Sequence, residues 1–264
     1  ESGKCPHKSP RISDTRRAVR IECGNPVRIL DIQTTTLRYE YPPGGGFDYA
    51  GGRCTARVST LVRVFTDSDH VGIGSVYSHP DLVRTIIEDQ LRPLLVGEDA
   101  ADVERLWERC YSVTRWYGRK GAAVSALGGV DIALWDLRGK AAGVPVYQLL
   151  GARRDTVPVY ASALLWKRDT SELCEEARRH VGRGFRGMKM RLGRHYAYDL
   201  AALREVRETI GMECRLMIEG NARYPLEQVR RLVPEFRKAG ISVEFQDAAK
   251  TDKRPMLEIL KHIK

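Results

Sequence analysis

The sequence predicts an α/β protein in which an α+β domain precedes part of a parallel β/α barrel. Three observations carry this prediction. The 264 residues are enough for one large domain or two moderate ones, and 42% of them are apolar. Strand patterns come before helix patterns up to about residue 150, whereas the two alternate afterwards. In that second part the strand starts, near residues 157, 185, 214 and 242, recur every 28 or 29 residues.

Residues 27–150 form the predicted α+β domain. The alternating run at 27–32 and the β-branched run at 55–65 predict strands. Between them, residues 41–53 are too rich in glycine for regular structure, and they predict either a mobile flap or a plain hairpin loop. Apolar residues at helical spacing then predict helices over 81–95, 101–116 and 119–143. Pro145 ends the last helix or begins a short turn.

Residues 151–264 predict four βα units. The expected strands are 157–162, 185–192, 214–219 and 241–247, and the helices that follow them are 171–183, 200–210, 226–239 and 255–263. A parallel sheet of this kind is either a barrel or a doubly wound sheet. No Gly-x-Gly-x-x-Gly follows any strand, which disfavours a dinucleotide site. We favour the barrel, whose functional groups lie at the C-terminal ends of the strands.

The net charge of +10 is partly concentrated in residues 1–26, which we expect to be a basic, disordered tail. Nucleic-acid binding is the weakest of the functions considered, since the tail has no aromatic residue to stack on bases. A small anionic substrate also suits a basic protein. No window is apolar enough to predict a membrane span. Six scattered cysteines without a Cys-x-x-Cys pair indicate reduced thiols and a cytoplasmic protein.

Polar residues end two neighbouring predicted strands. Alternation places Lys189 and Arg191 on one face of their strand, and Glu219 and Asn221 on one face of the next. Cationic groups beside carboxylate and amide oxygens are what a metal-assisted carbon-acid site needs. Two salt-bridged strand ends would give the same pattern, so both interpretations stay open at this point.

The run ALGGVDIALWDLRGK at 126–140, continued by PVYQLLG at 145–151, is highly specific. It resembles the helix signature of the mandelate racemase and muconate lactonizing branch of the enolase superfamily. The resemblance implies a capping domain followed by a modified, TIM-like β/α barrel. Residues 41–53 and 77–80 look like the family's capping loops that choose substrate. By this resemblance, Tyr41, Tyr77 and His79 are predicted substrate-binding residues.

The resemblance also implies a chemistry, which is abstraction of the proton α to a carboxylate with Mg²⁺ stabilising the enediolate. Lys189 and Arg191 match a Lys-x-Lys/Arg motif and would be catalytic through their charges. Glu219 would bind Mg²⁺, and Asn221 would assist the substrate. Together these features look like an acid-sugar dehydratase or racemase.

The pattern departs from the family at three places. Gln246 stands where a metal-binding carboxylate is expected, so Gln246 or the neighbouring Asp247 would be a compromised ligand. Arg191 stays protonated and is a weak base candidate. The sequence also ends after four βα units, whereas a complete barrel has about eight. We therefore expect a C-terminally truncated relative that is impaired as an enzyme, with half barrels paired in a homo-oligomer. The alternative is a non-catalytic scaffold or inactive fragment.

Overall fold

The computed structural model describes residues 26–49, 52–220 and 224–241. These residues divide into two compact units. The first contains residues 26–40 and 56–156, and the second contains residues 41–55 and 157–241, with the gaps already given. The basic tail expected at residues 1–26 lies outside the described residues, apart from its last residue.

The first unit is built on an antiparallel sheet with the order β1-β4-β5. Its strands are β1 (Ile29–Glu40), β4 (Ala56–Thr66) and β5 (Val71–Val76). Alternation sends Val62, Val64 and Val76 to the buried face. In residues 41–55, which belong to the second unit, the strands β2 (Phe47–Tyr49) and β3 (Gly52–Cys54) pair antiparallel. The expectation that residues 41–53 are too rich in glycine for regular structure was therefore wrong, because five of the six paired residues are not glycine. The choice between a mobile flap and a plain hairpin loop stays a prediction.

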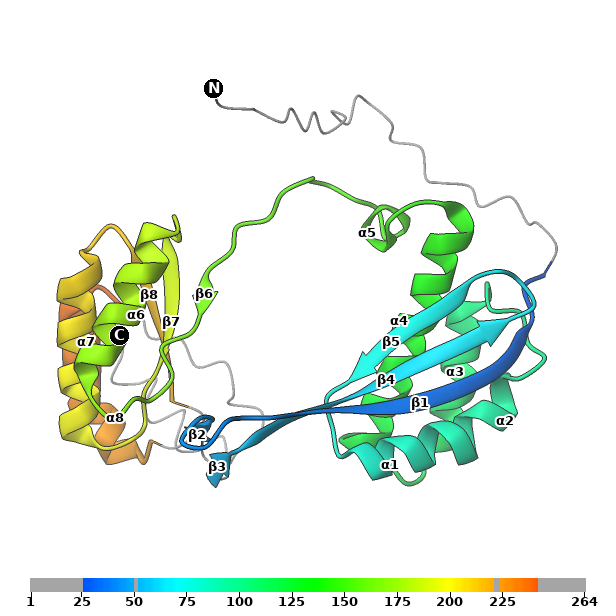
Figure 1. The fold of residues 1–264 in the computed structure, drawn as a ribbon, viewed down its shortest axis with the longest axis horizontal. Coiled ribbons are helices and arrows are strands. Elements are labelled where there is room, and N and C mark those ends of the chain that lie inside the picture. The colour runs from blue at the N-terminus through cyan, green and yellow to red at the C-terminus, as the bar shows by residue number, and fades with distance from the viewer. Residues whose placement is uncertain (1–25, 50–51, 221–223, 242–264) are drawn as a thin grey trace. The chain divides into compact units, whose positions relative to one another are not determined.

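The helical segments of this unit are α1 (Pro80–Thr85), the π-helical segment η1 (Ile86–Leu91), α2 (Arg92–Leu95), α3 (Val103–Thr114), α4 (Ala122–Ala142) and α5 (Val146–Leu149). The segments α1, η1, α2 and α4 pack against the sheet, whereas α3 and α5 pack mainly against α4. Helix α4 packs along β4 and β5 (Figure 1). The approach is close because glycines face each other there. A Cβ on Gly74 would lie 2.0 Å from the carbonyl oxygen of Gly129.

The outer edge of β5 is covered by two charged residues of α4. The carboxylate of Asp136 accepts a hydrogen bond from the backbone N–H of Ile73 at 2.8 Å. The ammonium of Lys140 donates to the carbonyl oxygen of Val71 at 2.7 Å and also pairs with Asp136. An edge strand offers unpaired backbone groups to other chains, so this pair of side chains protects the edge while it docks the helix.

The second unit is a parallel sheet with the order β6-β7-β8. Its elements are β6 (Ala161–Ser162), α6 (Thr170–Gly182), β7 (Gly187–Arg191), α7 (Tyr196–Ile210), β8 (Arg215–Glu219) and α8 (Leu226–Lys238). Met188, Met190 and Leu216 point into the core formed with α6 and α7. The intervening residues of each strand face the opposite side of the sheet.

The fold class is mixed α/β, as predicted, and the alternation of strands and helices after residue 150 is confirmed through α8. The first parallel strand is shorter than predicted. Pro158 cannot donate a ladder hydrogen bond, and Val157 and Val159 are exposed, so pairing begins at Ala161. The predicted fourth strand and helix lie outside the described residues, apart from Ile241.

Candidate functional site

The register of β7 and β8 brings the predicted site residues to one face of the sheet. Lys189 is paired with Met217, and Arg191 is paired with Glu219. Because paired residues of parallel strands share a face, Lys189, Arg191 and Glu219 lie together on the face opposite the helices. They stand at the C-terminal ends of their strands, where the loops of a β/α fold gather.

These three side chains form an ion cluster. The ammonium Nζ of Lys189 lies 2.8 Å from Oε2 of Glu219, and Nη2 of Arg191 lies 3.9 Å from the same oxygen. The side chains are 30%, 17% and 34% exposed for Lys189, Arg191 and Glu219 respectively, so the cluster is partly desolvated and still reachable. Within the described part of the chain, no three His, Cys, Asp or Glu side chains come together as a metal site.

The backbone around the cluster is tied across all three strands. The N–H of Arg191 donates to the carbonyl oxygen of Leu164, and the N–H of Leu192 donates to that of Glu219. Leu164 follows β6 in a left-handed conformation, with φ of 52°, although it is fully buried. A non-glycine residue with positive φ is uncommon and costs conformational energy, so the end of β6 is a strained point beside the cluster.

A buried carboxylate behind the cluster was missed by the sequence reasoning. Asp199, in the first turn of α7, is 0% exposed. Its oxygens accept hydrogen bonds from the N–H groups of Gly193 and Arg194 at 3.1 and 3.2 Å, and from the hydroxyl of Tyr224 at 3.1 Å. Burial raises the pKa of Asp199, whereas these donors act to lower it. Burial and the neighbouring carboxylate raise the pKa of Tyr224, which therefore stays a hydrogen-bond donor.

The sequence did carry one signal for this residue. Helix α7 begins at Tyr196, four residues earlier than predicted, with His195 as its N-cap. Nδ1 of His195 accepts from the N–H of Tyr198 at 3.3 Å. With the helix start at its actual place, Asp199 falls in the first turn, where an acidic residue meets free N–H groups.

The other predicted site residues are placed as follows. Asn221, Gln246 and Asp247 lie outside the described residues. Tyr41 belongs to the second unit and packs edge-to-face against Phe47, with the ring centroids 6.3 Å apart. In the first unit, Tyr77 is 77% exposed and follows β5, and His79 is the exposed N-cap of α1. The substrate roles of these residues, and the catalytic and metal roles assigned above, stay predictions.

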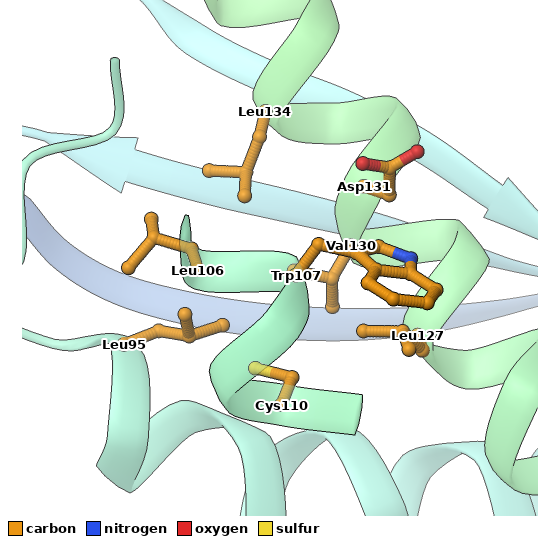
Figure 2. Close-up of a pocket in the computed structure, with 8 residues that line it drawn as sticks. All are labelled: Leu95, Leu106, Trp107, Cys110, Leu127, Val130, Asp131 and Leu134. Atoms are coloured by element: carbon orange, nitrogen blue, oxygen red, sulfur yellow. The ribbon is translucent and has the colours of Figure 1, made fainter. Parts of the chain in front are cut away.

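A niche in the first unit offers no alternative site. Figure 2 shows its lining, which is Leu95, Leu106, Trp107, Cys110, Leu127, Val130, Asp131 and Leu134. The space leaves no room for a water molecule. Asp131 supplies the one carboxylate among these lining residues, and burial raises its pKa. This niche is the packed junction of α2, α3 and α4, and it lacks the converging polar groups of a binding site.

The described helices include none that is long and apolar enough to cross a membrane.

Comparison with known families gives two adjoining matches. Residues 46–151 match the family described as "Mandelate racemase / muconate lactonizing enzyme, N-terminal domain". Residues 172–245 match "Enolase C-terminal domain-like". The arabinonate dehydratase of Saccharolobus solfataricus is 34% identical over 195 residues, which are 72% of this chain and 52% of that enzyme. The chain thus spans about half the length of this relative.

Solved structures agree with the family matches. A member of the enolase superfamily from Polaromonas sp. JS666 superposes with a TM-score of 0.81 at 29% identity, over 89% of this chain and 62% of that one. A racemase from Streptomyces coelicolor A3(2) with bound magnesium superposes with a TM-score of 0.75 at 29% identity, over 81% of this chain and 60% of that one. The fold is accordingly a capping domain followed by part of a β/α barrel.

Proposed function

Because the chain belongs to the mandelate racemase and muconate lactonizing enzyme branch of the enolase superfamily, we propose that it acts on a small sugar acid with Mg²⁺. The proposed reaction removes the proton α to the substrate carboxylate and leads to dehydration or to racemisation. The similarity to an arabinonate dehydratase and to a racemase with bound magnesium supports these two outcomes equally.

The observation that carries the proposal is the cluster of Lys189, Arg191 and Glu219 on one sheet face. Two cations at the strand ends attract an anionic substrate, and the partial burial of Arg191 strengthens that attraction relative to bulk water. A guanidinium presents paired donors that match a carboxylate, so Arg191 would orient the acid group. Lys189 would stabilise the negative charge that develops when the α-proton leaves.

The proposed metal ligand within the described residues is Glu219, a hard oxygen ligand of the kind that Mg²⁺ prefers. One carboxylate oxygen already lies against Lys189, so metal binding would require the ammonium to give up part of this contact. When bound, the ion would supply Lewis-acid stabilisation of the substrate carboxylate. The remaining predicted ligands are Gln246 and Asp247.

Calorimetric titration with Mg²⁺ tests the metal assignment. We expect Glu219→Ala to weaken Mg²⁺ binding at least tenfold, since it removes a direct oxygen ligand. The matched control is Glu213→Ala, which removes an exposed carboxylate of the same unit and should leave the affinity unchanged. Equal Mg²⁺ affinity in the parent and in Glu219→Ala would overturn the assignment.

Turnover tests the reaction. Incubating the protein and Mg²⁺ with a panel of aldonic and aldaric acids should give 2-keto acids if it dehydrates, or deuterium exchange at C2 if it racemises. Lys189→Met should lower the rate by at least a hundredfold, because it removes a charge that acts at the reacting carboxylate. Tyr160→Phe, at an exposed position of the same unit, serves as the control.

A second candidate function is a non-catalytic relative retained as a scaffold. Gln246 favours it, because a neutral amide is a poorer Mg²⁺ ligand than a carboxylate. Absence of both 2-keto acid formation and deuterium exchange over the whole panel, with Mg²⁺ still bound, would favour this candidate. We further propose a homo-oligomer in a reducing, cytoplasmic setting, which is in keeping with the buried free cysteines Cys110, Cys174 and Cys214 of the described residues. Size-exclusion chromatography with light scattering measures the oligomeric state.

A further inference from the structure

Asp199 links the chain segments that leave β7 and β8. Its donors Gly193 and Arg194 follow Arg191 at the end of β7. Its donor Tyr224 lies between β8 and Pro225, the N-cap of α8, and Gln228 of α8 adds a longer contact of 3.5 Å. One fully buried carboxylate therefore gathers donors from both loops and from a helix. A charge placed so deeply is stable only when such donors surround it.

The contacts close into a ring that includes the backbone of Glu219. The ring of Tyr224 lies against Gly220, where a Cβ would come within 2.6 Å of the aromatic Cδ2 atom. Gly220 directly follows Glu219, and the carbonyl oxygen of Glu219 accepts the N–H of Leu192 at 3.0 Å. From Leu192 the chain continues to Gly193, which donates to Asp199. The backbone of Glu219 is thus held from both sides.

We propose that Asp199, acting through Tyr224 and Gly220, is a positioning residue that holds Glu219 in register with Lys189. It touches neither side chain of the ion pair. The hydroxyl of Tyr224 is the element of this linkage that can be removed with least disturbance, because Tyr224→Phe keeps the ring against Gly220 and deletes one hydrogen bond to Asp199. The part of the proposal that concerns Mg²⁺ rests on the proposed function.

The first experiment is independent of Mg²⁺. A double-mutant cycle with Lys189→Met and Glu219→Gln measures the coupling of the ion pair by urea unfolding of the full chain in EDTA. The cycle is run in the parent and again in the Tyr224→Phe background. We expect a coupling of about fivefold in the unfolding equilibrium constant for the parent. It should fall towards onefold without the hydroxyl, and an unchanged coupling would overturn the proposal.

A matched core variant distinguishes the positioning role from a merely structural one. Val206→Ala removes buried volume from the same helix, α7, without touching the ring of contacts. It should lower the midpoint of unfolding and leave the coupling of Lys189 with Glu219 at its parent value. If Val206→Ala reduces the coupling as much as Tyr224→Phe does, general loosening explains the effect and the positioning role is wrong.

The second experiment measures the consequence for Mg²⁺. Residues that orient a metal ligand change affinity by roughly 10- to 100-fold, and we expect Tyr224→Phe to weaken Mg²⁺ binding by about tenfold. If the parent itself does not bind Mg²⁺, the proposed function fails, whereas the double-mutant cycle still decides the positioning role. If the parent and Tyr224→Phe bind Mg²⁺ equally well, the positioning role fails and the metal assignment stands.

Discussion

The two units bury polar side chains of different kinds. Among the residues that the structure describes, the first unit buries three neutral hydroxyls, those of Thr60, Thr66 and Thr114. The second unit buries a carboxylate, Asp199, and a guanidinium, Arg207. Burying a charge costs far more free energy than burying a hydroxyl unless the charge is fully hydrogen-bonded. The interior of the first unit therefore depends mainly on the fit of apolar side chains, whereas that of the second also depends on hydrogen-bond partners for its buried charges.

The two buried charges of the second unit hold loops at opposite ends of the parallel sheet. Asp199 acts after the C-terminal ends of the strands, and Arg207 acts before the start of β8. Asp199 gathers the chain that follows β7 and β8, beside the ion cluster. Arg207 donates to the carbonyl oxygens of Gly211 and Cys214, which precede β8, and to that of Ala239, which follows α8. The buried charges of the second unit therefore fix its loops, and the loops at the C-terminal strand ends carry the proposed chemistry.

Removing Arg207 should give the largest effect. Arg207→Met leaves three carbonyl oxygens without the donors that satisfy them at 2.7 to 2.8 Å. We expect a loss of about 4 kcal/mol in the free energy of unfolding, within the range for breaking a buried charged interaction. Urea unfolding followed by circular dichroism measures the change.

Arg204→Met is the matched control on the same helix. Arg204 pairs with Glu235 at 2.8 Å, but its side chain is 63% exposed. Exposed ion pairs contribute about 0 to 1 kcal/mol, so this variant should remain close to the parent in stability. Equal losses of unfolding free energy in the two arginine variants would show that the stability of the second unit does not depend on its buried charge.

The stability of the first unit should depend on close packing, as the stability of the second unit depends on its buried charge. Gly128 and Gly129 are neighbours on α4, and alanine at either position gains helix propensity. A Cβ on Gly129 would lie 2.2 Å from Cγ2 of Val76, whereas a Cβ on Gly128 would meet nothing within 4 Å. Gly129→Ala should lose about 3 kcal/mol through overpacking.

Gly128→Ala should gain about 1 kcal/mol, because a glycine in the interior of a helix costs conformational entropy. Urea unfolding of both variants beside the parent checks the opposite signs. A stabilising Gly129→Ala would show that α4 and β5 can move apart at little cost, and the view of the first unit as closely packed would fail.

Much of the fold followed from local patterns in the sequence. The apolar runs before residues 189 and 219 predicted β7 and β8, and alternation with parallel register predicted that Lys189 and Glu219 share a face. These predictions succeeded because strand periodicity and parallel pairing depend on neighbouring residues. The helical spacing at 119–143 likewise predicted a long helix, and α4 (Ala122–Ala142) confirms it.

The parts that were not predicted depend on contacts between distant residues. Asp199 and Tyr224 are 25 positions apart, and nothing local distinguishes a buried aspartate from the exposed one usual in a first helical turn. The sequence does not predict the strained conformation of Leu164 either, since its backbone angles depend on hydrogen bonds to other elements. Pro158, by contrast, is a local signal for a shortened strand, because proline cannot donate a ladder hydrogen bond.

The last expected effect concerns the buried thiol of the first unit and follows from pH. Cys110 is 1% exposed, and burial raises its pKa to about 11. In the unfolded chain a thiol titrates near pH 8.5. As the pH rises between these two values, the unfolded state releases a proton that the folded state keeps, so the free energy of unfolding falls. The stabilisation is complete below about pH 8 and is lost towards pH 11, with a total change of about 3 kcal/mol.

Urea unfolding at a series of pH values between 8 and 10.5, with reductant present, measures this slope. Cys110→Ala should be less stable at pH 8 because of its cavity, and it should lose less stability than the parent as the pH rises. Val103→Ala, at a buried position of the same core, supplies a cavity without removing the thiol and should keep the parent slope. If the slopes of the parent and Cys110→Ala coincide, the thiol ionises within the folded unit at no cost. The first unit would then tolerate a buried charge as readily as the second.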